Sequence, residues 1–251
     1  MRRKEAGERR KAVILVSGGM DSCVTAATAK ADGYQPAFLH INYGQRTEPR
    51  ELIAFNEIAG HYQIEQKLVV DISHLSEIGA SCLTDGNIEV SDADLESDDI
   101  PISYVPFRNA NILAAATSWA EVLGAKTIYV GAVEEDSSGY PDCRRSFFDA
   151  FEHTIDTGTK PGTQIKIITP LIHLSKKEIV EKGITLDAPL HLTWSCYENE
   201  AVPCGCLLHI SEPTRPLYIS YAVFCLKKKK HIYRYSYIPS VSTHLPPNST
   251  S

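Results

Sequence analysis

The sequence contains no apolar run long enough to cross a membrane, since a spanning helix needs about 20 consecutive apolar residues. It also lacks a secretory signal, which would place about 7–15 apolar residues behind a basic start. Only the short run Ala12–Val16 follows the basic first residues. An excess of positive charge is missing as well, because the formal net charge is −6, and this balance disfavours nucleic acid as a partner. We therefore expect a cytoplasmic protein that binds neither membranes nor nucleic acid.

The chain also lacks an even number of cysteines. The chain has seven, and an odd number without a secretory signal argues against a framework of disulfides. Three of them, Cys196, Cys204 and Cys206, lie close together in the sequence. This clustering indicates a metal site rather than structural disulfides.

What the sequence does contain is an alternation of strands and helices. With 251 residues, 43% of them hydrophobic, the chain is long enough for one large α/β domain. Apolar runs of strand length predict strands at 12–16, 36–41, 67–72, 127–133 and 165–168. Helical spacing predicts helices at 23–31, 47–61, 109–123 and 146–156, and one more that Ser175 caps with Glu178 as its capping-box partner. The alternation predicts a mostly parallel, doubly wound, Rossmann-like α/β sheet within residues 1–195.

Two segments do not fit this alternation. Residues 84–103 are crowded with Asp and Glu and have little apolar pattern, so they form either a solvated loop or a mobile lid over a site. Residues 207–251 show no core-building period, contain the basic run Lys227–Lys230 and end in a stretch rich in Ser, Thr and Pro. We expect this tail to be disordered or poorly packed.

The turn Ser17-Gly18-Gly19-Met20-Asp21-Ser22 connects the first predicted strand to the first predicted helix. Glycines allow the backbone to approach a phosphate closely, and the start of a helix offers N–H groups and a positive dipole end to an anion. The loop lacks the Lys of Gly-x-x-x-x-Gly-Lys-Ser/Thr and also lacks Gly-x-Gly-x-x-Gly. A simple tight turn is the alternative. The predicted ATP-binding residues are Val16, Ser17, Gly18, Gly19, Met20, Asp21, Ser22, Cys23, Val24, Thr25 and Ala26.

Asp21 is unusual beside a polyanion unless it holds a cation. Because Mg²⁺ binds carboxylate and phosphate oxygens together, we assign Asp21 this role as a hypothesis. With Asp21 and Ser22 in place, the loop resembles the pyrophosphate loop (PP-loop) of the N-type ATP pyrophosphatases. The resemblance implies that a substrate attacks the α-phosphate of ATP, that pyrophosphate leaves and that the substrate is adenylated.

Four further segments narrow this resemblance. They are Asn-Tyr-Gly-Gln-Arg at 42–46, Tyr-Val-Pro-Phe-Arg-Asn at 104–109, Ser-Gly-Tyr-Pro-Asp-Cys-Arg at 138–144 and Thr-Trp-Ser-Cys-Tyr at 193–197. Together with the loop they resemble the 7-cyano-7-deazaguanine synthases over about residues 11–206. The resemblance implies a ligase of queuosine biosynthesis that forms C–N bonds. Its substrates would be 7-carboxy-7-deazaguanine, ammonia and ATP, its products 7-cyano-7-deazaguanine, AMP and pyrophosphate, and its assembly a homodimer.

The same segments supply the predicted substrate site, which combines cations for phosphate or carboxylate, an aromatic surface for a purine-like ring and a carboxylate for its amino edge. The predicted substrate-binding residues are Arg108, Asn109, Tyr140, Asp142 and Arg144. Simpler roles stay open, because Asn109 would also serve as a helix cap, Tyr140 as part of a turn and Arg144 in a surface ion pair. The predicted catalytic residues are Asp21, Arg108 and Lys176. For Lys176 and its neighbour Lys177, a solvated helix face is the alternative.

The resemblance also implies a structural zinc site, held by one cysteine and, after a spacer, three more at Cys-x-x-Cys-x-x-Cys spacing. Cys196 and Cys204 match, but Cys206 comes one residue too early and the next cysteine is Cys225. Structural zinc takes four ligands. Either His209 or Cys225 completes the site, or the reading frame has shifted after Gly205 and 207–251 is a foreign tail, which the abrupt loss of resemblance favours. We therefore expect substoichiometric zinc.

Two other functions stay open. A tRNA-modifying member of the pyrophosphatase group would need an added RNA-binding domain, for which 251 residues leave little room. A degenerate nucleotide-binding protein would be inactive, although the loop and the four segments are intact in this sequence.

Overall fold

The computed structural model describes residues 10–79, 81, 83–84, 104–134 and 140–194. All of these belong to the first of the two units, Met1–Cys206 and Leu207–Ser251, into which the chain divides. The acidic segment apart from Thr84, the cysteine cluster and the tail lie outside the described residues. The predicted domain limits and the choice between loop and lid stay predictions.

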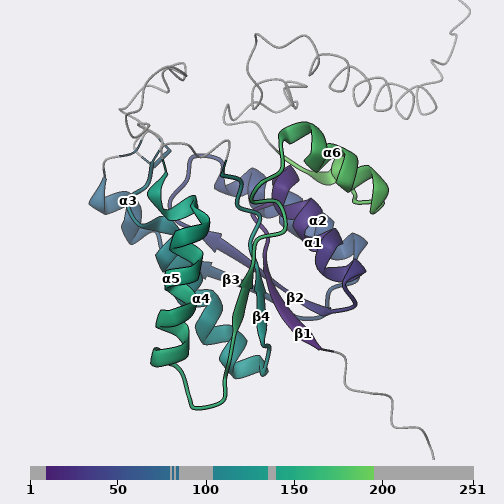
Figure 1. Cartoon of the computed structure of the whole chain (residues 1–251). Coiled ribbons are helices and arrows are strands. Elements are labelled where there is room, and N and C mark those ends of the chain that lie inside the picture. Colours follow the sequence, from purple (N-terminus) through teal and green to yellow (C-terminus); the bar gives the residue numbers. More distant parts are fainter. Residues whose placement is uncertain (1–9, 80, 82, 85–103, 135–139, 195–251) are drawn as a thin grey trace, which may run out of the picture. The chain divides into compact units, whose positions relative to one another are not determined.

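One sheet contains the strands β1 (Lys11–Leu15), β2 (Gln35–Asn42), β3 (Lys67–Asp71), β4 (Thr127–Tyr129) and β5 (Lys166–Ile168). Their order is β3-β2-β1-β4-β5 and every pair is parallel (Figure 1). The register places Lys11 opposite Gln35 and Val13 opposite Ile128. Central strands of a parallel sheet are covered on both faces, which explains their continuous apolar runs. The predicted doubly wound α/β fold is confirmed.

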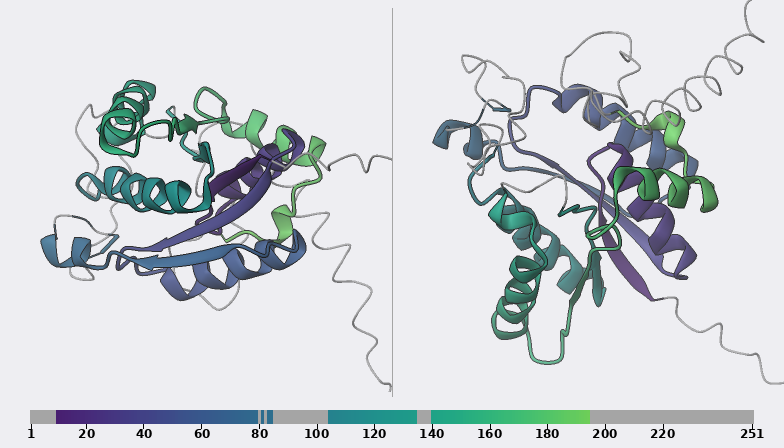
Figure 2. Two further views of the ribbon diagram at one scale, coloured as in Figure 1. Left: turned by 90° about the horizontal axis from the view of Figure 1, so that it is seen from below. Right: turned by 45° about the horizontal axis from the view of Figure 1, so that its top comes forward.

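Helices cover both faces of this sheet (Figure 2). They are α1 (Met20–Ala31), α2 (Glu48–His61), α3 (His74–Ile78), α4 (Arg108–Leu123), α5 (Arg145–Gly158) and α6 (Lys176–Thr185), with the short 3-10 helices η2 (Pro141–Cys143) and η3 (Leu190–Leu192). Val13 of β1 lies in one core cluster with residues of α4 and α5. Its neighbour Ile14 lies in a second cluster with residues of α1 and α2. Successive strand side chains point to opposite faces, so β1 supplies both cores.

Most predicted elements are confirmed, with differences at their ends. The predicted helix at 23–31 begins earlier, at Met20, so half of the phosphate loop forms the first turn of α1. The strand predicted at 127–133 is wrong beyond Tyr129. The Val130 N–H still donates to the Ile168 carbonyl at 2.9 Å, and beyond it Gly131 packs against the backbone of Asp21. The capping box predicted at Ser175 is present.

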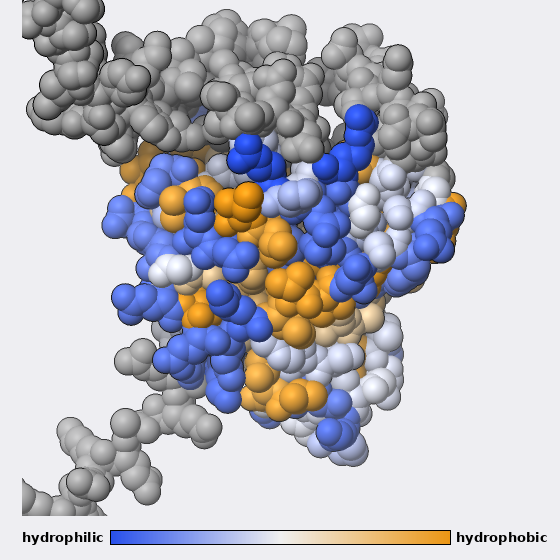
Figure 3. Space-filling view, turned by 180° about the vertical axis from the view of Figure 1, so that it is seen from behind, coloured by the Kyte–Doolittle hydropathy of each residue, from blue (hydrophilic) through white to orange (hydrophobic). Residues whose placement is uncertain are grey.

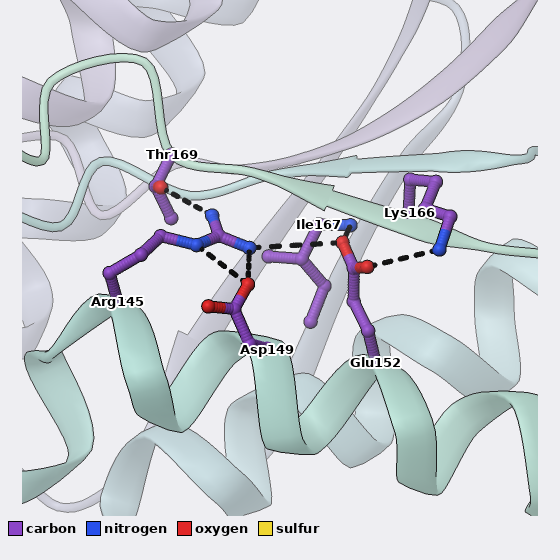
Figure 4. A network of polar contacts seen from close by, with 6 residues as sticks. All are labelled: Arg145, Asp149, Glu152, Lys166, Ile167 and Thr169. Atoms are coloured by element: carbon purple, nitrogen blue, oxygen red, sulfur yellow. Dashed lines mark hydrogen bonds and ion pairs between the residues drawn. The ribbon is translucent and has the colours of Figure 1, made fainter.

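Glu152 of α5 covers the outer edge of β5 (Figure 4). The N–H of Lys166 is donated toward β4, to the carbonyl of Lys126, so the next N–H, that of Ile167, points away from the sheet. Oε1 of Glu152 accepts that N–H at 2.6 Å, and Oε2 lies 3.1 Å from Nζ of Lys166. Unpaired edge groups are templates for pairing with another chain, and Glu152 satisfies one of them.

We expect Glu152→Ala to lower the free energy of unfolding by about 1–2 kcal/mol, because the Ile167 N–H loses its partner. Urea unfolding measures this change, and light scattering measures any gain in self-association. Asp149→Ala is the matched control, since Asp149 is 62% exposed and pairs with Arg145 one turn away. It should stay within about 0.5 kcal/mol of the parent. Equal losses in both variants would contradict this role of the strand-edge contact.

Several large apolar side chains stay exposed on this unit. Ile53 of α2 is 50% exposed, Val69 of the edge strand β3 is 44% exposed and Val122 of α4 is 80% exposed. Figure 3 shows apolar side chains gathered in the middle of the face seen from behind, bordered by hydrophilic ones. Contiguous exposed apolar surface often marks an interface, but the homodimer stays a prediction. Within the described ranges, no helix has the length and apolarity that a membrane crossing requires.

Candidate active site

The predicted phosphate loop follows β1, the middle strand of the sheet. From β1 the chain proceeds through α1 to β2 and β3, and then returns through α4 to β4 on the other side of β1. The strand order therefore reverses beside β1. Ligands of open α/β sheets bind at such a switch point, beyond the carboxyl ends of the strands. Because α1 begins there, its first N–H groups and positive dipole end favour an anion.

Two glycines allow the backbone segments around the loop to lie close together. Gly18 has φ +92°, and a Cβ built on it would lie 2.6 Å from the carbonyl oxygen of Glu51 in α2. A Cβ on Gly131, after β4, would lie 3.1 Å from the backbone carbonyl of Asp21. Real Cβ atoms essentially never show the first distance and seldom show the second, so a side chain at Gly18 would displace α2 and one at Gly131 would crowd the start of α1. The loop thus depends on glycine for its conformation and for its packing.

Hydroxyl groups connect the two ends of the loop. The Oγ atoms of Ser17 and Ser22 lie 3.2 Å apart, and the Ser22 hydroxyl donates to the Gly19 carbonyl at 2.9 Å. The Gly19 N–H donates to Ser17 Oγ at 3.3 Å. Ser17 is exposed at the mouth of the loop. These contacts hold the loop as a compact turn at the start of α1.

Lys176 meets Asp21 across the site. Its Nζ lies 2.9 Å from Oδ2 of Asp21, and the two side chains are 12% and 28% exposed. Lys176 is the first residue of α6, whose start is fixed by the Ser175 capping box. The adjacent Lys177 instead lies 3.9 Å from Glu181 on the outer side of α6. The structure therefore separates the two lysines and brings only Lys176 to the phosphate loop.

The segments at 104–109 and 140–144 lie against each other. Oδ2 of Asp142 accepts the backbone N–H of Asn109 at 2.9 Å, and Asn109 Nδ2 donates to the Asp142 carbonyl at 2.9 Å. Asp142 is 4% exposed. The N-cap of α4 is Phe107, with φ +56°, so Asn109 is not the cap. Asp142 supplies the acceptor for the first turn of α4 from another loop, as a carboxylate suits a helix start.

Aromatic side chains accompany the predicted cation of this region. Arg108 donates from Nη1 to the hydroxyl of Tyr43 at 3.3 Å and lies 5.1 Å from the centre of its ring. The rings of Tyr104 and Tyr140 are 5.8 Å apart with 32° between their planes. The Tyr104 hydroxyl accepts the N–H of Phe107 at 3.0 Å. These contacts place Arg108 beside the ring of Tyr43, and they place the Tyr104–Tyr140 ring pair beside the backbone at the start of α4.

Trp194 joins the phosphate loop from the far end of the described chain. Its backbone N–H donates to the Gly18 carbonyl at 2.9 Å, and the guanidinium of Arg50 lies 5.1 Å from the centre of its ring. Tyr43, Tyr104 and Trp194 lie within the four motif segments but were not predicted as site residues from the sequence. Their aromatic character inside those segments was the available signal.

The family model for the "Queuosine biosynthesis protein QueC" matches residues 11–208. The chain belongs to the QueC family. The match spans the phosphate loop and the four segments on which the resemblance was based, so that prediction is confirmed. The cysteines Cys196, Cys204 and Cys206 fall inside the matched range but outside the described residues, so the metal site predicted for them stays a prediction. Among the described residues, no group of three or more potential ligand side chains is placed to hold a metal ion.

Curated relatives of this chain share one name. The 7-cyano-7-deazaguanine synthase of Chlorobaculum parvum is 58% identical over 78% of this chain and 86% of its own length. The synthases of the same name from Chlorobium phaeobacteroides and Chlorobium phaeovibrioides are 59% and 60% identical over the same shares. A solved structure of NMN synthetase from Francisella tularensis is similar at 15% identity and TM-score 0.46, over 93% of this chain and 90% of that one.

The predicted substrate-binding residues do not all have the same surroundings. Asn109 and Asp142 hold each other and the start of α4, while Arg108 and Tyr140 have aromatic neighbours. Arg144 is exposed, and its carbonyl accepts the N–H of Phe147 at the start of α5 at 3.0 Å. The substrate contacts themselves stay predictions.

Cys23 lies in α1 directly after the loop and is fully buried. Burial raises the pKa of its thiol from 9.0 to about 12, because the charged thiolate is disfavoured away from water. Thiolate is the nucleophilic form of cysteine. Cys23 is therefore a packing residue beneath the loop and is unsuited to act as a nucleophile.

The shifted thiol predicts a pH dependence of stability. An acid whose pKa is raised by folding is neutral in the folded state and ionises first in the unfolded state. The contribution of Cys23 is therefore complete below pH 9.0 and is lost as the pH rises toward 12. Denaturant unfolding between pH 8 and pH 11 should show a decline that is shallower in Cys23→Ala. Identical slopes for the parent and this variant would contradict the assignment.

Proposed function

We propose that this chain is a 7-cyano-7-deazaguanine synthase, which uses ATP to convert 7-carboxy-7-deazaguanine and ammonia into 7-cyano-7-deazaguanine. The observation that carries the proposal is the name shared by relatives about 58% identical to it over most of their length. The geometry supports it, because the loop at the switch point of the sheet suits a polyphosphate. Arg108 lies over the ring of Tyr43, which directly follows β2, and the rings of Tyr104 and Tyr140 lie 5.8 Å apart.

The chemistry follows from the substrate's carboxylate. One carboxylate oxygen forms a bond to the α-phosphorus of ATP while the bond to the β-phosphate bridge breaks, and pyrophosphate leaves with that electron pair. Ammonia then displaces AMP to give an amide and loses a proton. The amide oxygen then attacks the α-phosphorus of a second ATP, and pyrophosphate and one N–H proton leave. Loss of AMP together with the remaining N–H proton leaves the nitrile. Such reactions need positioning and neutralisation of charge rather than a side-chain nucleophile.

The residues have distinct roles in this proposal. The N–H groups at the start of α1 and the hydroxyls of Ser17 and Ser22 bind phosphate oxygens. Lys176 is held at the loop by Asp21 and neutralises charge on the phosphates. Arg108 pairs with the substrate carboxylate or a phosphate. Tyr140 flanks the deazaguanine ring, and any contact of Asp142 with the ring's amino edge would fall to Oδ1, since Oδ2 accepts from Asn109.

Mg²⁺ fits the donor set at the loop. Asp21 offers a carboxylate beside the phosphate position, and Mg²⁺ usually takes one or two carboxylates together with phosphate oxygens. When bound it would neutralise phosphate charge, and Asp21 is the residue that would hold it. Zinc is a separate question, because three clustered cysteines fall short of the four ligands of a closed structural site.

The direct test supplies the purified protein with ATP, Mg²⁺, ammonia and 7-carboxy-7-deazaguanine. Mass spectrometry should detect AMP and the nitrile, in a ratio of two AMP per nitrile because each of the two steps consumes one ATP. The Asp21→Asn variant is the negative control. If pyrophosphate is released only with a different acid, the proposed substrate is overturned but the proposed adenylation is kept. Release of ADP and phosphate would overturn both the substrate and the adenylation.

A further inference from the structure

His40 is a buried polar residue that the proposed reaction does not use. It lies in β2 and is fully buried, against the ring of Phe55 at a centroid distance of 5.1 Å. Its Nδ1 lies 2.9 Å from the carbonyl oxygen of Val16, the last residue before the phosphate loop. A carbonyl oxygen only accepts, so Nδ1 carries the hydrogen and the ring donates to Val16.

The other nitrogen of this ring has no comparable contact. Nε2 of His40 is buried without a hydrogen-bond partner among the described residues. A buried polar atom without a partner costs stability, so an apolar residue would suit this core position better if packing were its only requirement. His40 therefore contributes the hydrogen bond to Val16, which an apolar residue could not make.

The contact determines the direction of one peptide unit. In a trans peptide the C=O and the following N–H point in opposite directions. Because His40 holds the Val16 carbonyl on the core side, the N–H of Ser17 points the other way. Leu39 fixes the same residue from behind, since its carbonyl accepts the Val16 N–H at 2.9 Å. Two successive residues of β2 thus hold both backbone groups of Val16.

The Gly18–Gly19 peptide is held in the same manner as the Val16–Ser17 peptide. The Gly18 carbonyl accepts the N–H of Trp194 at 2.9 Å, so the Gly19 N–H points away from Trp194 and lies 3.3 Å from Ser17 Oγ. Carbonyl oxygens turned toward a phosphate would repel it, whereas N–H groups attract it. Donors outside the loop therefore turn the Val16 carbonyl, directly before the loop, and the Gly18 carbonyl, within it, away from the anion position.

We propose that His40 is a positioning residue for ATP binding, which orients the Val16–Ser17 peptide so that the Ser17 N–H faces the phosphates. This inference rests on the proposed use of ATP but not on the identity of the acid. Through the direction of this peptide, a buried histidine affects the affinity of the protein for the nucleotide.

The test compares three substitutions by calorimetric titration with ATP and Mg²⁺ in the absence of the acid. In His40→Asn the Nδ2 atom is bonded to Cγ, as Nδ1 is in histidine, so the donor is kept in place. In His40→Gln the donor lies one bond further out, and in His40→Leu it is absent. We expect the Kd for ATP to rise roughly tenfold in the Leu and Gln variants and by less than about threefold in the Asn variant.

Thermal unfolding of the same three proteins separates positioning from stability. If His40 only stabilised the fold, the variants with the lowest thermal midpoints would bind ATP most weakly. The position of the donor in the Asn and Gln variants would then make no difference to the Kd for ATP. Equal Kd values for Asn and Gln, or a Leu variant that binds ATP as the parent does, would overturn the inference. If the Leu variant does not fold, the Asn and Gln pair decides. If the parent protein does not bind ATP, both the proposed function and this inference are overturned. If it binds ATP but turns over another acid, only the proposed function is overturned.

Discussion

Replacing Lys176 by Met is expected to lower the rate of AMP formation by roughly a hundredfold or more, as loss of a preorganised charge at a reacting group does. Lys176 Nζ lies 2.9 Å from Asp21 at the phosphate loop, and its side chain is only 12% exposed. A cation held this way contributes to phosphate chemistry without reorganisation at the moment of reaction. Steady-state assays of AMP with saturating ATP measure the effect.

The neighbouring lysine provides the matched control. Lys177→Met removes the same charge from the same turn of α6, but Lys177 is 48% exposed and lies 3.9 Å from Glu181. Its rate should stay within about twofold of the parent, since exposed pairs contribute little. A Lys176→Met protein with more than a tenth of the parent rate would contradict the assignment.

A double variant distinguishes catalysis from stability at this pair. Removing Lys176 alone leaves the carboxylate of Asp21 without this partner at 2.9 Å, which should lower the thermal midpoint. Asp21→Asn combined with Lys176→Met removes both charges and should recover part of the midpoint. The rate of AMP formation should not recover, because neither the Lys charge nor the predicted Mg²⁺ ligand is restored. Joint recovery of both quantities would mean that the pair is structural.

Gly18→Ala is expected to abolish measurable ATP binding and to lower the free energy of unfolding by about 2–4 kcal/mol. Its φ of +92° disfavours any side chain, and the new Cβ would lie 2.6 Å from the Glu51 carbonyl. Backbone cannot yield as a flexible side chain does, so the loop or α2 must move. Because the loop donors are fixed by this backbone, their directions change with it. Calorimetry with ATP and urea unfolding measure the two effects.

Gly33→Ala separates the backbone penalty from the loss of space. Gly33 also has a positive φ, +81°, but nothing lies within 4 Å of a Cβ built there. It should cost only about 1–2 kcal/mol of stability, and its ATP affinity should match that of the parent. Loss of ATP binding in both variants would show that general destabilisation, and not the geometry of the loop, is responsible.

Local pattern was sufficient for the sheet and for the loop. Apolar runs predicted all five strands, and the Gly18-Gly19 turn with the following helix predicted the phosphate loop, since each is specified by neighbouring residues. The predictions were less exact where contacts between distant segments decide the local structure. The strand predicted at 127–133 ends at Tyr129, and beyond it Gly131 packs against the start of α1. Asn109, for which a helix cap was the alternative role, lies within the first turn of α4 beside Asp142.

By itself, the sequence determined the family and the fold class, and it predicted the residues of the phosphate loop, whose contacts with ATP stay predictions. These depend on the order of strands and helices and on short motifs, both of which are read along the chain. Only the tertiary structure decided which of two adjacent lysines reaches Asp21 across 155 positions of sequence. It also decided that His40 and Trp194 hold the carbonyl groups of Val16 and Gly18. The physical reason is that crossovers and helix packing bring such groups together, and no local period of the sequence records those contacts.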